Sequence, residues 1–193
     1  VEKAGFHSRH RPATNYAGRY TMLIPGAQDA AAAPVGDGIS AVTVALSGNA
    51  TLAGHLADGT PFARRAALAS NGRVSLFQSL YRGRGVLIGI VNLRPAPDAG
   101  SDIDGDAYWL RLAGAKPSTY TNGFLLSSMI AGSAFASSKT TNLLGLSEAR
   151  MIFELPAGAV MVTNQIAFGL GASVTNQGPG VMTLTIASSS GLF

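Results

Sequence analysis

The sequence predicts an all-β protein in which an antiparallel meander forms a β-barrel, with a β-sandwich as the alternative and little or no helix. The first observation is regular punctuation by Gly48, Gly59, Gly72 and Gly83, the spacing of short strands joined by tight turns. The second is turn chemistry, because Ser-Gly-Asn, Asp-Gly and Asn-Gly sequences tolerate a positive φ. The third is alternation of apolar residues between the turns, which places one face of each strand in a core.

The predicted meander covers residues 39–93, and its last strand is apolar on both faces. Residues 86–93 place Ile88 and Ile90 on one face and Leu87 and Val91 on the other. A strand that is apolar on both sides is typically covered on both sides. We therefore expect another layer of this chain, or a partner, to cover the outer face.

We expect residues 1–17 to form an irregular arm and residues 18–193 to form a single barrel-like domain. Residues 27–38 are rich in alanine but lack an apolar stripe, which favours a loop. Residues 150–155 and 160–168 resemble the two strands of a hairpin. The other strands expected outside the meander cover residues 18–24, 104–112, 123–136, 142–146 and 181–187.

Composition indicates a chain of 193 residues that is long enough to bury a real core. Charged residues make up only 12%, against about 25% in typical globular proteins. Such a neutral surface is common in secreted, surface-displayed or self-associating proteins. The chain contains no cysteine, which excludes disulfides, thiol catalysis and thiolate metal sites.

No segment has the length and apolarity of a transmembrane helix, so we expect no membrane-spanning segment. The residues two apart from the terminal Phe193 are Gly191, Ser189 and Ala187, a poor lipid-facing row, which argues against an outer-membrane barrel. The first residues do not form a signal peptide, so we expect a mature or excised chain.

Basic residues gather in the first twenty positions. These residues are Lys3, His7, Arg9, His10, Arg11 and Arg19. Such a segment could contact phosphate groups. No aromatic interleaving accompanies it, so we interpret it as a solvated leader and expect no nucleic acid partner.

An acidic cluster is the only sequence feature that suggests a metal. Asp102, Asp104 and Asp106 alternate and are followed or separated by small residues, which is compatible with weak calcium binding, because Ca²⁺ takes several oxygen ligands. The later bidentate Glu of an EF-hand loop is missing. We therefore expect a solvated acidic loop and no cofactor, with calcium as the alternative.

Aromatic residues could form a platform for a glycan, since aromatic faces stack on sugars. The candidates are Tyr81, Tyr108, Trp109 and Tyr120. Core packing is the commoner use of such residues. The adjacent Arg64 and Arg65 must face opposite ways on a strand, which indicates an edge strand protected by charge.

Motifs of known enzyme classes are missing from the sequence. Of the three histidines, His7 and His10 lie in the expected arm and His55 on the polar face of a strand. Neither a His-Glu-x-x-His spacing nor a Gly-x-Ser-x-Gly elbow occurs. We expect a protein that is not an enzyme. A hydrolase would require a cleft that brings His55 together with an acid and a hydroxyl.

Several runs of residues resemble a recurrent β-rich module of large exported bacterial proteins, notably those of Verrucomicrobia. These runs are Gly18-Arg-Tyr-Thr-Met-Leu-Ile-Pro-Gly26, Gly54-His-Leu-Ala-Asp-Gly-Thr60, Leu80-Tyr-Arg-Gly-Arg-Gly85, Tyr108-Trp-Leu110 and Tyr120-Thr-Asn-Gly-Phe124. In outline the module is similar to the barrel of surface lipoproteins like transferrin-binding protein B. The resemblance implies a barrel and an extracellular or cell-surface location in a bacterium, and it supplies no catalytic residues.

In similar modules a further hairpin follows the stretch that matches residues 183–193 and completes the barrel. We therefore expect an open sheet edge next to residues 181–193, with the arm 1–17 as a candidate strand donor. The expected function is a non-enzymatic structural or adhesive module that self-associates with other copies or neighbouring β-modules. The alternatives are a binding module for a glycan or a small apolar ligand, and an unrecognised hydrolase.

Overall fold

The computed structural model of the chain describes residues 5–95, 102–115, 120–154, 161–180 and 182–188. It divides into two compact units, residues 1–134 and 135–193, which are described separately. This division differs from the single domain predicted over residues 18–193. Among the described residues there is no α-helix, which confirms the all-β prediction.

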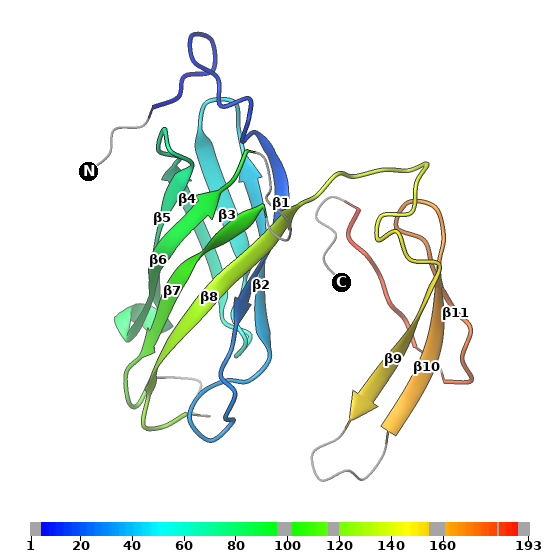
Figure 1. Cartoon of the computed structure of the whole chain (residues 1–193). Coiled ribbons are helices and arrows are strands. Elements are labelled where there is room, and N and C mark those ends of the chain that lie inside the picture. Colours follow the sequence, from blue (N-terminus) through cyan, green and yellow to red (C-terminus); the bar gives the residue numbers. More distant parts are fainter. Residues whose placement is uncertain (1–4, 96–101, 116–119, 155–160, 181, 189–193) are drawn as a thin grey trace. The chain divides into compact units, whose positions relative to one another are not determined.

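The first unit is an eight-stranded antiparallel barrel that is nearly closed (Figure 1). Its strands are β1 (Gly18–Pro25), β2 (Asp37–Val44), β3 (Asn49–His55), β4 (Pro61–Ala67), β5 (Arg73–Leu80), β6 (Gly85–Leu93), β7 (Ile103–Arg111) and β8 (Phe124–Ala134). A short 3₁₀ turn, η1 (Tyr81–Gly83), lies between β5 and β6. The strand order is β4-β3-β2-β1-β8-β7-β6-β5, and every neighbouring pair is antiparallel.

The predicted meander over residues 39–93 is confirmed as strands β2 to β6. Gly48, Gly59 and Gly72 adopt φ values of 80°, 79° and 84° in the turns between these strands. A side chain with a Cβ is strained in this region, which is why glycine occupies the turns. Residues 27–36 lie outside the named strands, as the loop prediction for residues 27–38 expects. Asp37 and Gly38 differ from it, because they already belong to β2.

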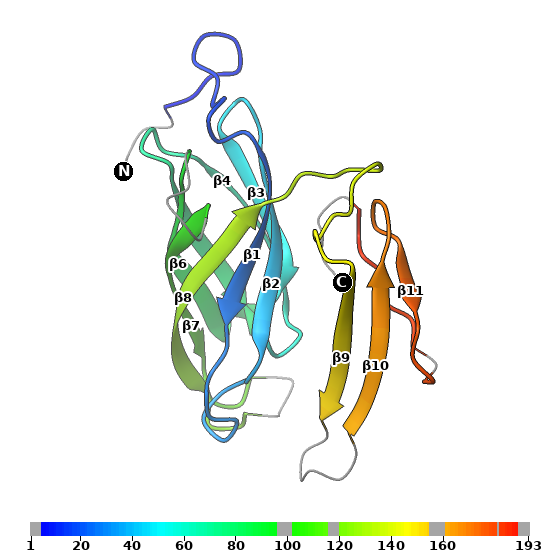
Figure 2. The ribbon, with the colours of Figure 1, turned by 45° about the vertical axis from the view of Figure 1, so that its right-hand side comes forward.

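Strands β1 and β8 lie side by side and pair with each other, which joins strands β1 to β4 to strands β5 to β8 (Figure 2). In this pairing Leu23 is opposite Ala131 and Tyr20 is opposite Ala134. The unpaired edges of the barrel are therefore β4 and β5, which are bridged only at Leu68 and Val74. We call the boundary between β4 and β5 the seam. The prediction that the open edge lies next to residues 181–193 differs from this arrangement, because β8 already closes the sheet onto β1.

The seam explains the adjacent arginines of β4. Arg64 and Arg65 are both exposed, and β4 is an edge strand, as the charge pattern predicted. Arg64 is opposite the buried Leu52 and so lies on the inward side of its strand. It remains accessible because the seam beside β4 carries no further strand.

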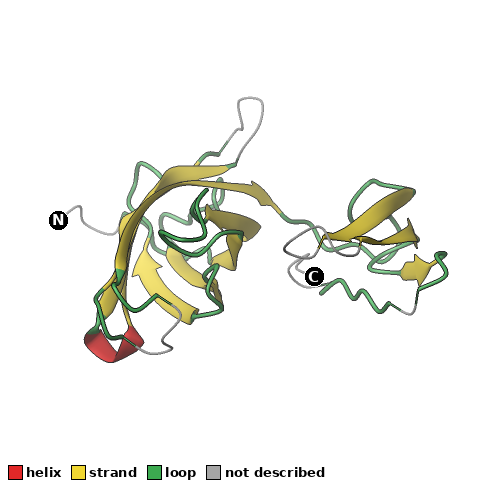
Figure 3. Ribbon diagram, turned by 90° about the horizontal axis from the view of Figure 1, so that it is seen from below, coloured by secondary structure: helices red, strands yellow, loops and turns green. Residues whose placement is uncertain are grey.

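Figure 3 shows the strands of the barrel in yellow and η1 in red. The barrel core consists of side chains that alternate inward along the strands. The largest fully buried apolar side chains of this unit are Met22, Ile24, Leu52, Leu68, Leu76, Leu87, Ile103 and Trp109. The interior of the barrel is thus packed with apolar side chains, as in other small barrels.

The described part of the arm packs on its own barrel. Ala13 is buried and its N–H donates to the carbonyl of Leu46 at 2.9 Å. Phe6 lies against the turn at Gly48 and makes an edge-on contact with Tyr16, with ring centroids 5.8 Å apart. The arm was predicted as a strand donor to another chain, but residues 5–17 are already used within their own unit.

The second unit contains a three-stranded antiparallel sheet of order β11-β10-β9. Its strands are β9 (Glu148–Glu154), β10 (Met161–Phe168) and β11 (Val174–Asn176). Strands β9 and β10 confirm the predicted hairpin, although its turn lies outside the described residues. The strands predicted at residues 142–146 and 181–187 are wrong for the described residues: Asn142 forms one isolated bridge with Gly171, and residues 182–187 form no strand.

Candidate functional site

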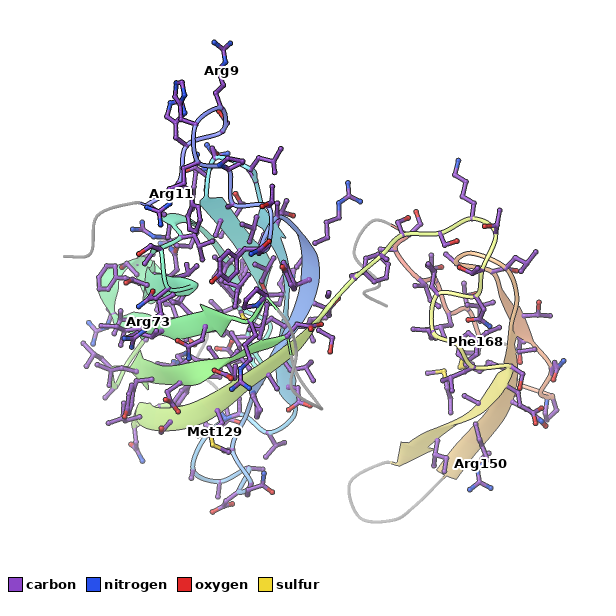
Figure 4. The ribbon with its side chains drawn as sticks, turned by 45° about the horizontal axis from the view of Figure 1, so that its top comes forward. Arg9, Arg11, Arg73, Met129, Arg150 and Phe168 are labelled. Carbon is purple, nitrogen blue, oxygen red and sulfur yellow. The ribbon has the colours of Figure 1, made fainter. Side chains whose placement is uncertain are left out.

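An apolar surface on the outside of strands β5 to β8 is the most prominent feature of the barrel. Its outward side chains are Phe77, Val86, Ile88, Ile90, Tyr108, Leu110, Leu125 and Met129, and we call this set the apolar face. Ile88 is 46% exposed, Leu125 68% and Met129 78%. Figure 4 shows Met129 on β8. Contiguous exposed apolar surface of this kind marks interaction sites in soluble proteins.

The strand register assembles the apolar face into continuous rows. One row runs from Phe77 through Ile88 to Tyr108. The neighbouring row joins Val86, Leu110 and Leu125. Side chains directly opposite each other on antiparallel strands are close enough to contact.

A third row contains the one acidic residue of this surface, because Asp106 lies between Ile90 and Met129. Strand β6 was predicted to be apolar on both faces and therefore covered. Its inner face is buried, whereas Ile88 and Ile90 on the outer face are exposed within the barrel unit.

The predicted aromatic platform does not form one exposed surface. Trp109 is 1% exposed and points inward, whereas its neighbour Tyr108 points outward. Trp109 packs edge-on against Phe124, with ring centroids 4.8 Å apart, and Phe124 contacts Tyr120 in the same way at 5.6 Å. Tyr81, Trp109 and Tyr120 therefore gather at the end of the barrel opposite the arm, and Tyr108 belongs to the apolar face.

Tyr81 closes the seam at this end of the barrel. Its hydroxyl donates to Oδ2 of Asp58 at 2.6 Å and accepts a bond from Nε1 of Trp109 at 3.1 Å. Asp58 lies in the turn before β4, and Tyr81 directly follows β5, so the bond joins the two unpaired strands. Tyr81 and Arg82 have φ values of 51° and 57°, a strained conformation that the surrounding contacts maintain. The guanidinium of Arg111 lies over the ring of Tyr81 at 5.1 Å.

Burial, followed by the hydrogen bond to Asp58, raises the pKa of Tyr81 well above its usual value of 10.0. A raised pKa in the folded state contributes stability that is complete below about pH 10 and is lost as the pH rises toward the shifted pKa. We expect the free energy of unfolding, measured with urea from about pH 8 to pH 11, to fall above pH 10. Tyr81→Phe should weaken this alkaline decrease, and an unchanged slope in the variant would contradict the assignment. The pKa of Tyr20, also raised by burial, accounts for part of the remaining slope.

The three aspartates predicted as a calcium alternative are not brought together by the structure: Asp102 and Asp104 have separate partners and Asp106 is exposed. The Oδ2 atom of Asp102 accepts a bond from the N–H of Ala134 at 2.5 Å. Asp104 forms an ion pair with Arg94 and accepts a bond from Nδ2 of Asn92 at 2.8 Å. Asp106 is exposed on the apolar face. In the part of the chain that the structure describes, no three acidic or histidine side chains are grouped so that they could hold a metal ion.

The three histidines lie in two separate places. His7 and His10 stack in the arm with ring centroids 5.1 Å apart. His55 is exposed at the end of β3. Within the described ranges, no hydrogen bond joins His55 to a carboxylate or a hydroxyl.

The second unit has an apolar groove of about 260 Å³ that sequence reasoning missed. It is lined by Leu144, Leu146, Ala149, Met151, Ile166, Phe168, Leu184 and Ile186. The signal for it was present in the alternation of Ala149 with Met151 and of Leu184 with Ile186, which gives each segment one apolar face. The groove could accept an apolar side chain or ligand.

Leu125 and Met129 are the functional candidates on β8 that the sequence did not single out. Residues 123–136 have apolar residues on both faces, like β6, but the glycines and serines among them obscured the period. The alternation that places Ile88 and Ile90 on one face of β6 also places Leu125 and Met129 on one face of residues 123–136, if this segment is read as a strand.

The fold and the apolar face together define a packed, nearly closed antiparallel β-barrel with an exposed apolar surface. The protein-family models, the curated proteins and the solved structures contain no significant match to this chain. No helix within the described residues is long and apolar enough to cross a membrane.

Proposed function

We propose that this chain is a non-enzymatic structural or adhesive module of the bacterial cell surface that self-associates through the apolar face. The observation that carries the proposal is the set of three outward rows on β5 to β8, with Tyr108 51% exposed near their centre. Exposure of such side chains to water is unfavourable by about 25 cal/mol per Å² of apolar area. A partner surface that covers them removes this cost.

A second copy of the same face is the partner that the geometry favours. In a two-fold arrangement each copy contributes the same patch, and aligned sheets pack face to face about 10 Å apart. The apolar face covers the outside of four adjacent strands and has one carboxylate, Asp106, in its third row. Face-to-face pairing does not use the free edges of β4 and β5 at the seam. Because each copy has one apolar face and that face is covered in the pair, we expect the assembly to stop at a dimer.

The size of the face sets the expected affinity. Strands about 4.8 Å apart and outward residues about 6.8 Å apart make four strands and three rows cover roughly 400 Å² of sheet. A standard interface buries about 800 Å² per partner. We therefore expect a weak association in the micromolar range or above.

A structural role is also supported by how the barrel uses its polar groups. The buried hydroxyl of Tyr81 and the carboxylate of Asp58 bind each other across the seam, and Nη2 of Arg111 donates to the carbonyl of Ala115 at 2.8 Å. These groups stabilise the barrel end. The proposed surface location is supported by the low charge and by the resemblance to exported bacterial modules.

Ile88→Lys combined with Met129→Lys should weaken self-association at least about tenfold, because burial of an unpaired ammonium group costs several kcal/mol. The measurement is sedimentation velocity or light scattering over a series of micromolar protein concentrations. Wild-type protein should show a mass that rises with concentration, whereas the variant should stay near 19.7 kDa.

The matched control is Thr43→Lys combined with Ala53→Lys. Both residues are exposed on the outside of β2 and β3, so this variant adds the same charge to a different wall of the barrel. It should associate like the wild type. Wild-type protein that remains monomeric at the highest concentration, or equal weakening by the control, would rule out the proposed role of the apolar face.

A further inference from the structure

The described arm and the start of β5 form a second surface, which is basic. It consists of His7, Arg9, His10, Arg11 and Arg73, all exposed, and we call it the basic cap. It lies at the end of the barrel where β1, β3, β5 and β7 begin (Figure 4). None of its residues belongs to the apolar face.

The loop that carries four of these residues has a fixed shape. The N–H of His7 donates to the carbonyl of Arg11 at 2.8 Å, and the N–H of Arg11 donates back to His7 at 2.9 Å. The guanidinium of Arg11 lies 5.9 Å from the centre of the Phe6 ring. Because Phe6 packs on Gly48, the loop is attached to the barrel rather than free.

Arg73 is held beside the same structure. Its N–H donates to Oδ1 of Asn71 at 3.2 Å, in the turn that contains Gly72. A Cβ at Gly72 would approach the ring of Tyr16 to 2.9 Å, so Tyr16 lies directly against this turn. Tyr16 also contacts Phe6, and this aromatic pair links the loop to the turn before Arg73.

The positive charge of the basic cap is not neutralised within the described part of the chain. No described carboxylate forms an ion pair with His7, Arg9, His10, Arg11 or Arg73. Asp102 and Asp104, beside and within the start of β7, bind the N–H of Ala134 and the guanidinium of Arg94. Among the described residues, Arg9, Arg11 and Arg73 therefore have no carboxylate partner within the barrel unit.

We propose that the basic cap binds an anionic polysaccharide, one that carries sulfate or carboxylate groups along its chain. Arginine guanidinium groups pair with such anions through charge-assisted hydrogen bonds. Single-stranded nucleic acids are usually bound by aromatic side chains on which bases stack, but Phe6 and Tyr16 pack against turns. A duplex is bound through its phosphates alone, so DNA is included as a competing ligand in the experiment. A membrane surface would favour apolar side chains at the tip, and residues 7–11 contain none.

The experiment measures binding of the full chain to immobilised heparin, which carries sulfate, and to polygalacturonate, which carries only carboxylate. Arg9→Gln, Arg11→Gln and Arg73→Gln are combined in one variant. We expect at least about a tenfold loss of affinity and a smaller dependence of binding on salt, because three ionic contacts are removed. Binding to either polymer supports the proposal, and the preference between them identifies the anion.

The matched control combines Arg82→Gln, Lys139→Gln and Arg150→Gln. It removes the same charge from exposed residues outside the basic cap and should retain wild-type binding. The proposal is overturned by failure to bind either polymer, by equal losses in the two variants, or by binding of a DNA oligonucleotide or anionic phosphatidylserine vesicles as tight as that of the polymers. Failure here would leave self-association untouched, because the two surfaces share no residue.

Discussion

Trp109→Ala should lower the free energy of unfolding by about 3–5 kcal/mol, the usual cost of truncating a buried tryptophan. Trp109 is fully buried, packs against Phe124 and donates to the hydroxyl of Tyr81. Its truncation leaves a cavity and removes the hydrogen bond that Nε1 of Trp109 donates to the Tyr81 hydroxyl. Urea denaturation followed by circular dichroism measures the loss, since the variant has no tryptophan left for fluorescence.

Tyr108→Ala is the matched control for this prediction. Tyr108 is the adjacent residue on β7, but it points to the outside of the barrel. Its truncation should change monomer stability by less than about 1 kcal/mol, as is usual for surface positions. Equal costs for the two variants would show that the inward and outward faces of β7 are assigned incorrectly.

Gly105→Val should destabilise the barrel by about 3 kcal/mol or more, through backbone strain and overpacking together. Gly105 has a φ of 151°, and a Cβ at this position would lie 2.0 Å from the carbonyl oxygen of Ile90 on the neighbouring strand. The two strands would have to separate, which breaks the pairing between β6 and β7. The same urea experiment measures the effect.

Ala131→Val provides the comparison, because Ala131 is exposed on the outside of the adjacent strand β8. We expect a change within about 0.5 kcal/mol, since a β-branched residue is well accommodated on an exposed strand. A small effect of Gly105→Val would contradict the close approach of β6 and β7 at this point.

Local patterns in the sequence were sufficient to predict most of the barrel. The turn glycines and the alternation between them located β2 to β6, because a tight turn and its two strands are determined by residues close in the chain. Arg64 and Arg65 indicated an edge strand for the same reason. Pairing of β1 with β8 joins residues more than a hundred positions apart, and nothing in either segment specifies that partner.

The candidate sites show the same division between local and long-range information. The Asp-Ile-Asp-Gly-Asp run suggested an ion site, but Gly105 allows the close approach of two strands, Asp102 and Asp104 have other partners, and Asp106 is exposed. The four aromatic residues were proposed together as one platform, but the alternation along β7 places Trp109 inside the barrel and Tyr108 outside. The basic cap requires the fold, because the packing of Tyr16 against Gly72 and Phe6 links the turn before Arg73 to the arm.

The most direct test of self-association uses the absence of cysteine in the natural chain. Ile88→Cys and Tyr108→Cys, prepared separately, place a single thiol near the centre of the apolar face, and Thr43→Cys places one on the opposite wall. A disulfide requires Cβ atoms about 4 Å apart, so rapid oxidation reports face-to-face pairing. We predict that at least one of the two central variants forms a disulfide-linked dimer much faster than Thr43→Cys. Equal and slow oxidation of all three variants at micromolar concentration would contradict association through the apolar face.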